Sequence, residues 1–220
     1  NIFVLWRPAG EQLVVSNRDD VVSVLDGERC SVLASLRFHV EVNGLAFAPP
    51  GDTLLAATGA GSLDLVRLAG GGATARLERG RSVMAHPAPC FWVDVDPLGR
   101  HAALTSADSL VSVWDLQDLV CLRTFSRFEY PVRVVCFSHD GALLASLCET
   151  PVGEEVLVDV SHTASAAQLH SARHPVQPVN SARHPVQPVN SAVWHPSKYL
   201  LAFGGGNGKT DEPAPHIRVL

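Results

Sequence analysis

The sequence has 220 residues, of which 46% are hydrophobic and 18% are charged. This balance is ordinary for a globular protein and argues against disorder of the whole chain. The formal net charge of −5 gives no general attraction to phosphate backbones, so any RNA contact needs a local basic patch. No apolar run approaches the ~20 residues of a membrane helix, and no signal segment opens the chain.

The five cysteines are odd in number, and no two of them stand two to four residues apart. This spacing favours neither a disulfide framework nor a zinc knuckle. We therefore predict buried thiols in a reducing compartment. Because the sequence opens at Asn1 inside a strand-like run and its single methionine is Met84, we also expect a fragment of a longer protein.

Short β-rich runs recur along the chain, and most of them end in a turn that leads to a second apolar run. The first runs cover residues 2–8, 44–49, 92–97, 133–139 and 191–196. The second runs cover residues 12–15, 53–56, 101–104, 142–145 and 199–203. Each pair predicts a β-hairpin.

A third and a fourth strand follow each hairpin, as in residues 110–114 and 120–125. Four short strands that recur every ~40 to 45 residues are typical of β-propeller blades. The sequence therefore predicts an all-β fold, a single partial propeller domain over residues 1–220. Its five expected units cover residues 1–38, 39–84, 85–129, 130–190 and 191–220.

One unit contains an unchanged duplication, because residues 171–180 and 181–190 have the same sequence. The decapeptide is rich in proline and polar residues, so it suits neither a central strand nor a helix. We expect the extra copy to loop out at the surface. A recent duplication or a gene-model error is favoured over a peptide-binding motif.

The third unit combines four residue types that can form one buried hydrogen-bond network. His86, Ser106, Asp108 and Trp114 have the spacing of the structural tetrad of WD40 repeats. We expect Asp108 to hold the histidine N–H, and Ser106 to join the imidazole to the indole N–H. A Ser-His-Asp catalytic triad is the alternative, but there is no Gly-x-Ser-x-Gly elbow and no evident oxyanion hole.

Other chemistry-bearing patterns are weak. Residues 204–210 approach a phosphate-binding loop, but Phe203 replaces its first glycine and no helix can follow. The ten histidines lack the spacing of metal ligands. Asp94 and Asp96 share one strand face, yet nothing in their sequence context predicts a raised pKa. We therefore predict no catalytic, cofactor-binding or metal-binding residues and no cofactor.

Aromatic and arginine side chains in the predicted loops are candidates for a partner-binding face, because these residue types dominate interface hot spots. Packing of Phe128 and Tyr130 between blades is an equally good interpretation. The candidate residues are Arg18, Phe38, His39, Arg127, Phe128, Tyr130 and Arg133.

An ordered set of motifs extends over nearly the whole chain and resembles the WD40 subunit family of the THO complex, the nuclear assembly that packages and exports mRNA. Ala60 and Leu25 depart from the repeat pattern, since they replace a turn aspartate and a tryptophan. The motifs are residues 17–22, 96–100, 106–115, 119–121, 125–128, 131–133, 137–141, 192–196 and 200–203.

The resemblance implies a WD40-type propeller of seven blades, about five of them present here, with the others expected before Asn1. It implies a non-enzymatic nuclear scaffold within THO and the larger TREX assembly. Its partners would be the other THO subunits and, through the complex, an RNA helicase and an RNA-binding adaptor, with direct RNA contact left open and no membrane partner. A WD40 substrate receptor or peptide reader in a ubiquitin-ligase or chromatin complex is the alternative.

Overall fold

The computed structural model describes residues 3–8, 10–149, 155–175, 189–205 and 216–219. Its strands form five antiparallel sheets that follow chain order, which we call blades 1 to 5. Four blades have four strands, and blade 5 has three among the described residues. The prediction of an all-β fold built from four-stranded propeller units is confirmed.

The strand bounds of blades 1 and 2 are as follows. Blade 1 contains β1 (Val4–Trp6), β2 (Gln12–Ser16), β3 (Val21–Asp26) and β4 (Val32–Arg37). Blade 2 contains β5 (Val42–Ala48), β6 (Thr53–Thr58), β7 (Ser62–Ala69) and β8 (Arg76–Met84), with a short 3₁₀ helix, η1 (Gly72–Thr74), before β8.

The remaining strands belong to blades 3 to 5. Blade 3 contains β9 (Cys90–Val95), β10 (His101–Ser106), β11 (Val111–Asp115) and β12 (Val120–Phe125). Blade 4 contains β13 (Val132–Phe137), β14 (Leu143–Glu149), β15 (Glu155–His162) and β16 (Gln168–Pro175). Blade 5 contains β17 (Val189–Trp194), β18 (Leu201–Gly205) and β19 (His216–Val219).

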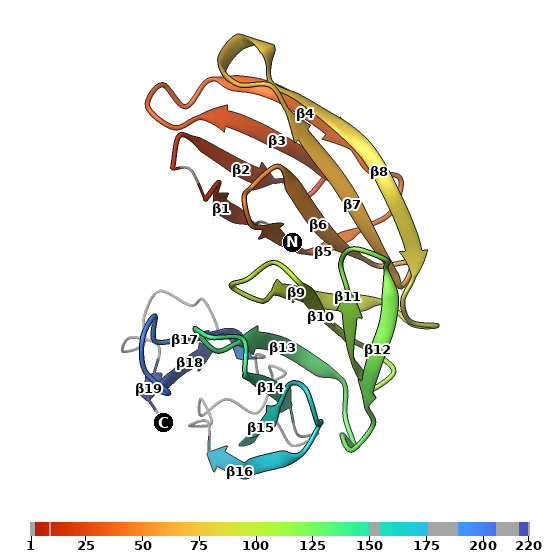
Figure 1. Ribbon diagram of the computed structural model, residues 1–220, viewed down its shortest axis with the longest axis vertical. Coiled ribbons are helices and arrows are strands. Elements are labelled where there is room, and N and C mark those ends of the chain that lie inside the picture. The colour runs from red at the N-terminus through yellow and green to blue at the C-terminus, as the bar shows by residue number, and fades with distance from the viewer. Residues whose placement is uncertain (1–2, 9, 150–154, 176–188, 206–215, 220) are drawn as a thin grey trace, which may run out of the picture.

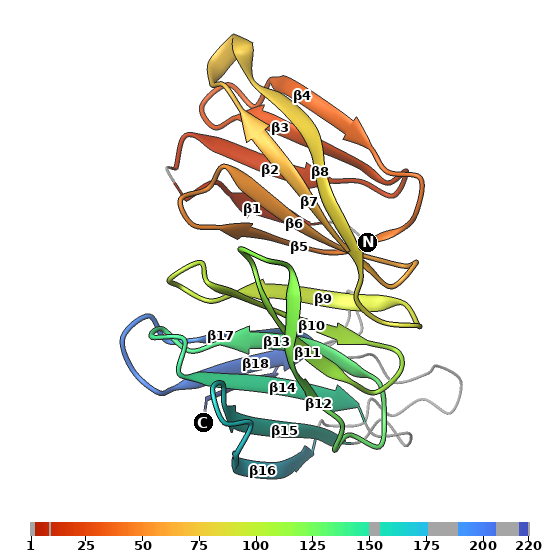
Figure 2. The same cartoon turned by 45° about the vertical axis from the view of Figure 1, so that its right-hand side comes forward.

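The blades follow one another along an arc (Figure 1). The first strands β5, β9, β13 and β17 pack against one another on the inside of this arc, and we call the first strand of each blade its inner strand. Figure 2 shows β5, β9 and β13 side by side in a second view. Strands β4, β8, β12 and β16 lie at the other end of the strand order, at the outer edge of each sheet.

The hydrophobic core lies between consecutive blades. Four clusters fill the spaces between blades 1 and 2, 2 and 3, 3 and 4, and 4 and 5. Second strands contribute to the clusters on both of their sides, so they contain continuous apolar runs rather than a strict alternation. In β6, Leu54 belongs to one cluster and Leu55 to the next, and both are fully buried.

The turns that join each inner strand to the second strand, which we call the inner turns, contact one another from blade to blade. Gly51 and Gly99 have φ values of +99° and +68°, a conformation that favours glycine. A Cβ atom on Gly51 would lie 2.7 Å from Cδ of Pro8, and one on Gly99 would lie 3.1 Å from the Pro49 carbonyl oxygen. Glycine is therefore required for close stacking of neighbouring inner turns.

Two sequence predictions need correction or remain open. Cys90, Cys136 and Cys148 are buried as predicted, but Cys30 and Cys121 are exposed, because Cys30 lies in the β3–β4 turn and Cys121 on the outer strand β12. The first half of the first decapeptide, residues 171–175, belongs to the outer strand β16. Residues 176–188, which include most of the duplication, lie outside the described residues, and β17 begins at Val189, before the expected start of the fifth unit.

Among the described residues no helix is long and apolar enough to cross a membrane.

Candidate functional site

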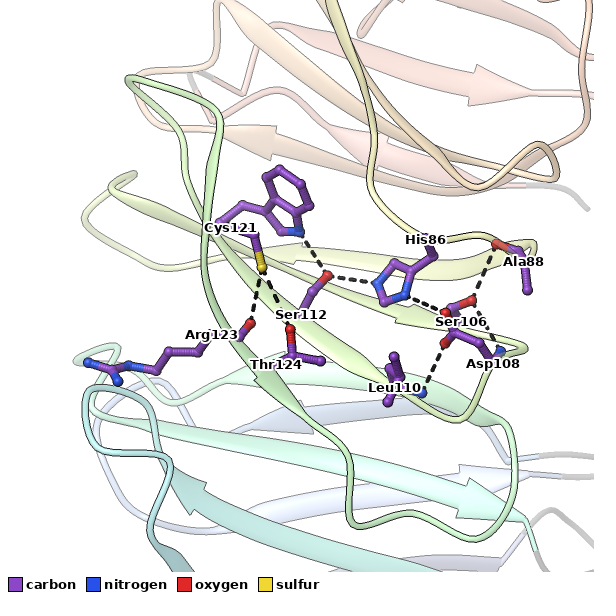
Figure 3. Close-up of polar contacts among 10 residues, drawn as sticks. His86, Ala88, Ser106, Asp108, Leu110, Ser112, Cys121, Arg123 and Thr124 are labelled. Atoms are coloured by element: carbon purple, nitrogen blue, oxygen red, sulfur yellow. Dashed lines mark hydrogen bonds and ion pairs between the residues drawn. The ribbon is translucent and has the colours of Figure 1, made fainter.

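A buried hydrogen-bond network joins the strands of blade 3 (Figure 3). Nδ1 of His86 lies 2.9 Å from Oδ2 of Asp108, and Nε2 lies 2.7 Å from Oγ of Ser112. The indole N–H of Trp114 donates to the same hydroxyl at 2.8 Å. Since His86 and Ser112 are 3% and 2% exposed, the imidazole nitrogens and the Ser112 hydroxyl depend on their protein partners.

Local structure positions the histidine and the aspartate. His86 lies in the connection from β8 to β9, where its backbone N–H donates to the Gly61 carbonyl at 3.0 Å. Gly61 has a φ of +87°, and a Cβ atom there would lie only 2.2 Å from the His86 carbonyl oxygen. Asp108 lies in the β10–β11 turn and accepts the Leu110 N–H at 3.0 Å. The network thus spans the junction of blades 2 and 3.

The serine predicted for this network was the wrong one. The hydroxyl between the imidazole and the indole belongs to Ser112 on β11, not to Ser106 at the end of β10. Ser112 and Trp114 are two residues apart on one strand, so their side chains share a face. Ser106 instead donates to the Ala88 carbonyl at 3.3 Å and accepts the Asp108 N–H at 3.3 Å.

Blade 4 has a charged network at the same place. Asp159 pairs with the fourth residue of β14, as Ser112 pairs with the fourth residue of β10. Arg127 donates through Nε to Asp159 at 3.0 Å and through Nη2 at 2.8 Å, and it also contacts Ser161. Gln168 donates to the same carboxylate at 2.6 Å. Arginine in the connection before blade 4 therefore takes the role of histidine before blade 3.

The predicted partner-binding face is only partly at the surface. Arg18 in the β2–β3 turn and His39 in the β4–β5 connection are exposed. Phe38 and Phe128 were expected on this face, but they are 3% and 6% exposed and belong to the core. Phe38 stands four residues before β5 and Phe128 four residues before β13, as His86 stands four residues before β9. At this position the connection turns the side chain inward.

The other predicted face residues have intramolecular partners. The Arg127 guanidinium binds Asp159 and lies 5.2 Å from the ring centroid of Phe125. Tyr130 is half-buried and packs against the core between blades 3 and 4, as the alternative interpretation expected. The Arg133 guanidinium lies 4.2 Å from the ring centroid of Phe91. Of the predicted face residues, Arg18, His39 and Arg127 are exposed, and the guanidinium of Arg127 is engaged by Asp159.

The outer strand β8 of blade 2 carries three arginines, Arg76, Arg79 and Arg81. Arg79 donates to the Arg37 carbonyl of blade 1. Arg81 donates to the Gln117 carbonyl of blade 3 at 2.7 Å, and Arg76 pairs with Glu78 at 2.5 Å. Arg79 and Arg81 therefore tie β8 to both neighbouring blades at the outer edge of the arc.

Burial raises the pKa of the Asp94 carboxyl to about 6, although the sequence context predicted no such shift. The nearby charge of Asp96 acts in the same direction, whereas backbone N–H groups of Phe137 and Val95 oppose it.

Within the described part of the chain, no group of three or more His, Cys, Asp or Glu side chains is arranged to hold a metal ion.

Comparison with known proteins places these features in a class. The fold resembles a chain of Kuenenia stuttgartiensis hydrazine synthase with a TM-score of 0.76, covering 91% of this chain and 54% of that one. Identity there is 17%, so this likeness concerns the fold alone. The WD repeat-containing protein AAC3 of Dictyostelium discoideum is 32% identical over 141 residues, 64% of this chain and 29% of that protein. The chain is a WD40-repeat β-propeller protein.

Within this class, the chain is related to THO complex subunit 3. The Arabidopsis thaliana protein of that name is 34% identical over 207 residues, which are 93% of this chain and 58% of the relative. The chain therefore spans less than two thirds of the length of the curated relatives it matches. No protein-family model matches the sequence.

Proposed function

We propose that this protein is a non-enzymatic scaffold subunit of the THO complex, in which it supports packaging and nuclear export of mRNA through protein–protein interaction. The observation that carries the proposal is the 34% identity to THO complex subunit 3 over 93% of the chain. Its partners would be the other THO subunits and, through them, an RNA helicase and an RNA-binding adaptor of TREX. Its location would be the nucleus.

The architecture suits a protein that acts by binding. Cores between consecutive blades and the networks of blades 3 and 4 hold the strands in one arrangement. A surface that is already ordered loses less conformational entropy on association than a flexible one. Exposed groups such as Arg18 and His39 therefore offer a preorganised surface to a partner.

The first test is affinity purification of the tagged full-length protein from nuclear extract at moderate salt, with partners identified by mass spectrometry. Recovery of the other THO subunits in near-equal amounts is the expected result. Recovery of a cullin adaptor or of histone-modifying subunits in their place would overturn the assignment and favour the substrate-receptor or peptide-reader alternative.

A paired variant locates the contact surface in the same experiment. Arg18 and His39 lie at the opposite end of the strands from the inner turns, because β2 connects an inner turn to the turn that holds Arg18. The double variant Arg18→Ala, His39→Ala is expected to recover less of the THO subunits. Lys198→Ala, an exposed change at the inner turn of blade 5, is the matched control and should recover them as the wild type does.

A further inference from the structure

A pocket of about 260 Å³ lies between the inner strands β9, β13 and β17. It occupies the ends of these strands that lead into the inner turns, at the end of the blades opposite to Arg18 and His39. Its polar and aromatic lining consists of Trp92, Asp94, Phe137, His139, Trp194 and His195. None of these residues belongs to the networks of blades 3 and 4.

The pocket contains a carboxylate with no cationic partner in the described structure. Oδ2 of Asp94 accepts the Phe137 N–H at 2.8 Å. None of the ion pairs found among the described residues includes Asp94. The raised pKa of Asp94 reflects the same situation, because burial there is not offset by a neighbouring positive charge. A cationic ligand would supply the missing charge.

His139 also lines the pocket. Nδ1 of His139 is buried and has no hydrogen-bond partner among the described residues. Its ring packs against Tyr199, with ring centroids 5.1 Å apart. Because this nitrogen is enclosed by the protein, His139 contributes part of the pocket wall and not a hydrogen bond to the ligand.

The aromatic lining comes from Trp92 and Trp194. The indole N–H of Trp194 donates to the Cys136 carbonyl at 3.1 Å and the residue is 9% exposed, so the part of the indole that lines the pocket offers apolar contact rather than a further donor. Aromatic faces attract cations, and arginine more often than lysine occupies such positions. Aromatic surface beside an unpaired carboxylate is therefore a cation-binding arrangement.

The size and the polar groups of the pocket together select the ligand. Small-molecule pockets are usually about 300 to 1,000 Å³, so this one suits a single side chain better than a whole organic ligand. A guanidinium is planar, stacks on indole rings, and donates several hydrogen bonds in fixed directions. We propose that the pocket formed by Trp92, Asp94, His139 and Trp194 binds the arginine side chain of a partner polypeptide.

This interaction goes beyond the scaffold function proposed above, and it does not depend on which complex the protein joins. An anionic ligand such as a phosphate group is disfavoured by the carboxylate of Asp94. A lysine ammonium satisfies the charge but not the planar stacking, because it is a compact and strongly hydrated point charge.

The test uses the full-length protein and N-acetyl-arginine amide, with binding followed by saturation-transfer NMR of the probe. The neutral isostere N-acetyl-citrulline amide is expected to bind at least about tenfold more weakly, because it lacks the charge that meets Asp94. Equal binding of the two probes, or no binding of the arginine probe, would overturn the proposal. Equal binding of N-acetyl-lysine amide would overturn the choice of arginine.

A variant pair places the binding in this pocket. Asp94→Asn is expected to weaken binding of the arginine probe about tenfold, because the charge is removed while an oxygen remains for the Phe137 N–H. Asp19→Asn, an exposed carboxylate change in the β2–β3 turn, should leave binding unchanged. Unchanged binding by Asp94→Asn would show that the probe binds elsewhere. The arginine and citrulline comparison on the wild type decides the proposal even where the Asp94 variant folds poorly.

Discussion

Blades 3 and 4 both bond the preceding connection to their third strand, but they use different side chains to do so. In blade 3, hydrogen bonds through His86, Ser112 and Trp114 join the preceding connection to the third strand, and Asp108 meets the other ring nitrogen of His86. In blade 4, the corresponding position holds an ion pair between Arg127 and Asp159. The two networks therefore differ in what remains when a central member is removed: loss of Ser112 leaves unsatisfied dipoles in blade 3, whereas loss of Arg127 leaves an unpaired carboxylate in blade 4.

The comparison teaches that a side chain from the connection can join the third strand from different positions, since His86 stands four residues before β9 and Arg127 stands five residues before β13. A side chain from the connection reaches the third strand in both blades, whether it carries an imidazole or a guanidinium. The energetic consequences differ, because an isolated buried charge costs more than an unpaired neutral group. Variants at these positions test this difference directly.

The largest effect is expected for Arg127→Ala. This change leaves the carboxylate of Asp159, which is 1% exposed, without its cation, and the free energy of unfolding should fall by about 3 kcal/mol. Urea unfolding measures the change, with Arg123→Ala on the exposed face of β12 as the control. Replacing both partners by apolar residues, Arg127→Met with Asp159→Leu, should restore most of the loss, and a double variant less stable than Arg127→Ala would contradict this account.

Ser112→Ala should have the next largest effect. It removes the shared acceptor of the Trp114 indole N–H and the partner of Nε2 of His86, so two buried groups lose a hydrogen bond. We expect a loss of about 2 kcal/mol in the free energy of unfolding. A loss as large as that of Arg127→Ala would remove the distinction between the two blades.

Asp94 adds a third case to the comparison, because its carboxyl group belongs to neither the blade 3 network nor the blade 4 network. Its pKa rises from 3.8 to about 6 in the folded protein, so its ionised form is disfavoured there. The resulting cost to stability is absent below about pH 4, grows as the pH rises through the interval to about 6, and is constant above it. Relative to the wild type, Asp94→Asn should therefore gain about 2 kcal/mol between pH 4 and pH 7.

The measurement is the difference in unfolding free energy between the two proteins across this pH range. Asp96, His139 and His195 lie close to Asp94 or line the same pocket, and they remain in both proteins, so their titration largely cancels in the difference. A pH-independent difference would mean that the carboxyl of Asp94 has an ordinary pKa.

The smallest effect is expected for Ser106→Ala. Both hydrogen bonds of its hydroxyl are 3.3 Å long, and neither reaches His86 or Trp114. We expect a loss of less than about 1 kcal/mol. A loss equal to that of Ser112→Ala in the same thermal or urea unfolding assay would restore Ser106 to the network.

The repeat and the strand pattern could be predicted from the sequence, because they depend on local alternation of apolar residues and on turn residues such as Gly51 and Gly99. The choice between Ser106 and Ser112 could not, because both serines lie near strand ends. The register of β9 against β10 shifts between Thr105 and Ser106, and such a shift depends on tertiary packing.

Two residues of the predicted face were placed wrongly for a related reason. Phe38 and Phe128 were placed on the face because they lie in connections, which are usually exposed. Their offset from the next inner strand equals that of His86, and this shared spacing was the signal in the sequence that could have identified them as buried. The pocket around Asp94 was out of reach, because it joins three blades whose contacts are far apart in sequence.

The stacked inner turns determine how a destabilising change in one blade affects the other blades. Each glycine turn contacts the turn of the adjacent blade, and the cores likewise lie between adjacent blades. Repeat proteins coupled in this way behave approximately as a one-dimensional chain of nearest-neighbour interactions. A side chain bulkier than hydrogen at Gly99 should thus accelerate amide hydrogen exchange in blades 2 and 3 first, while blade 5 keeps its protection.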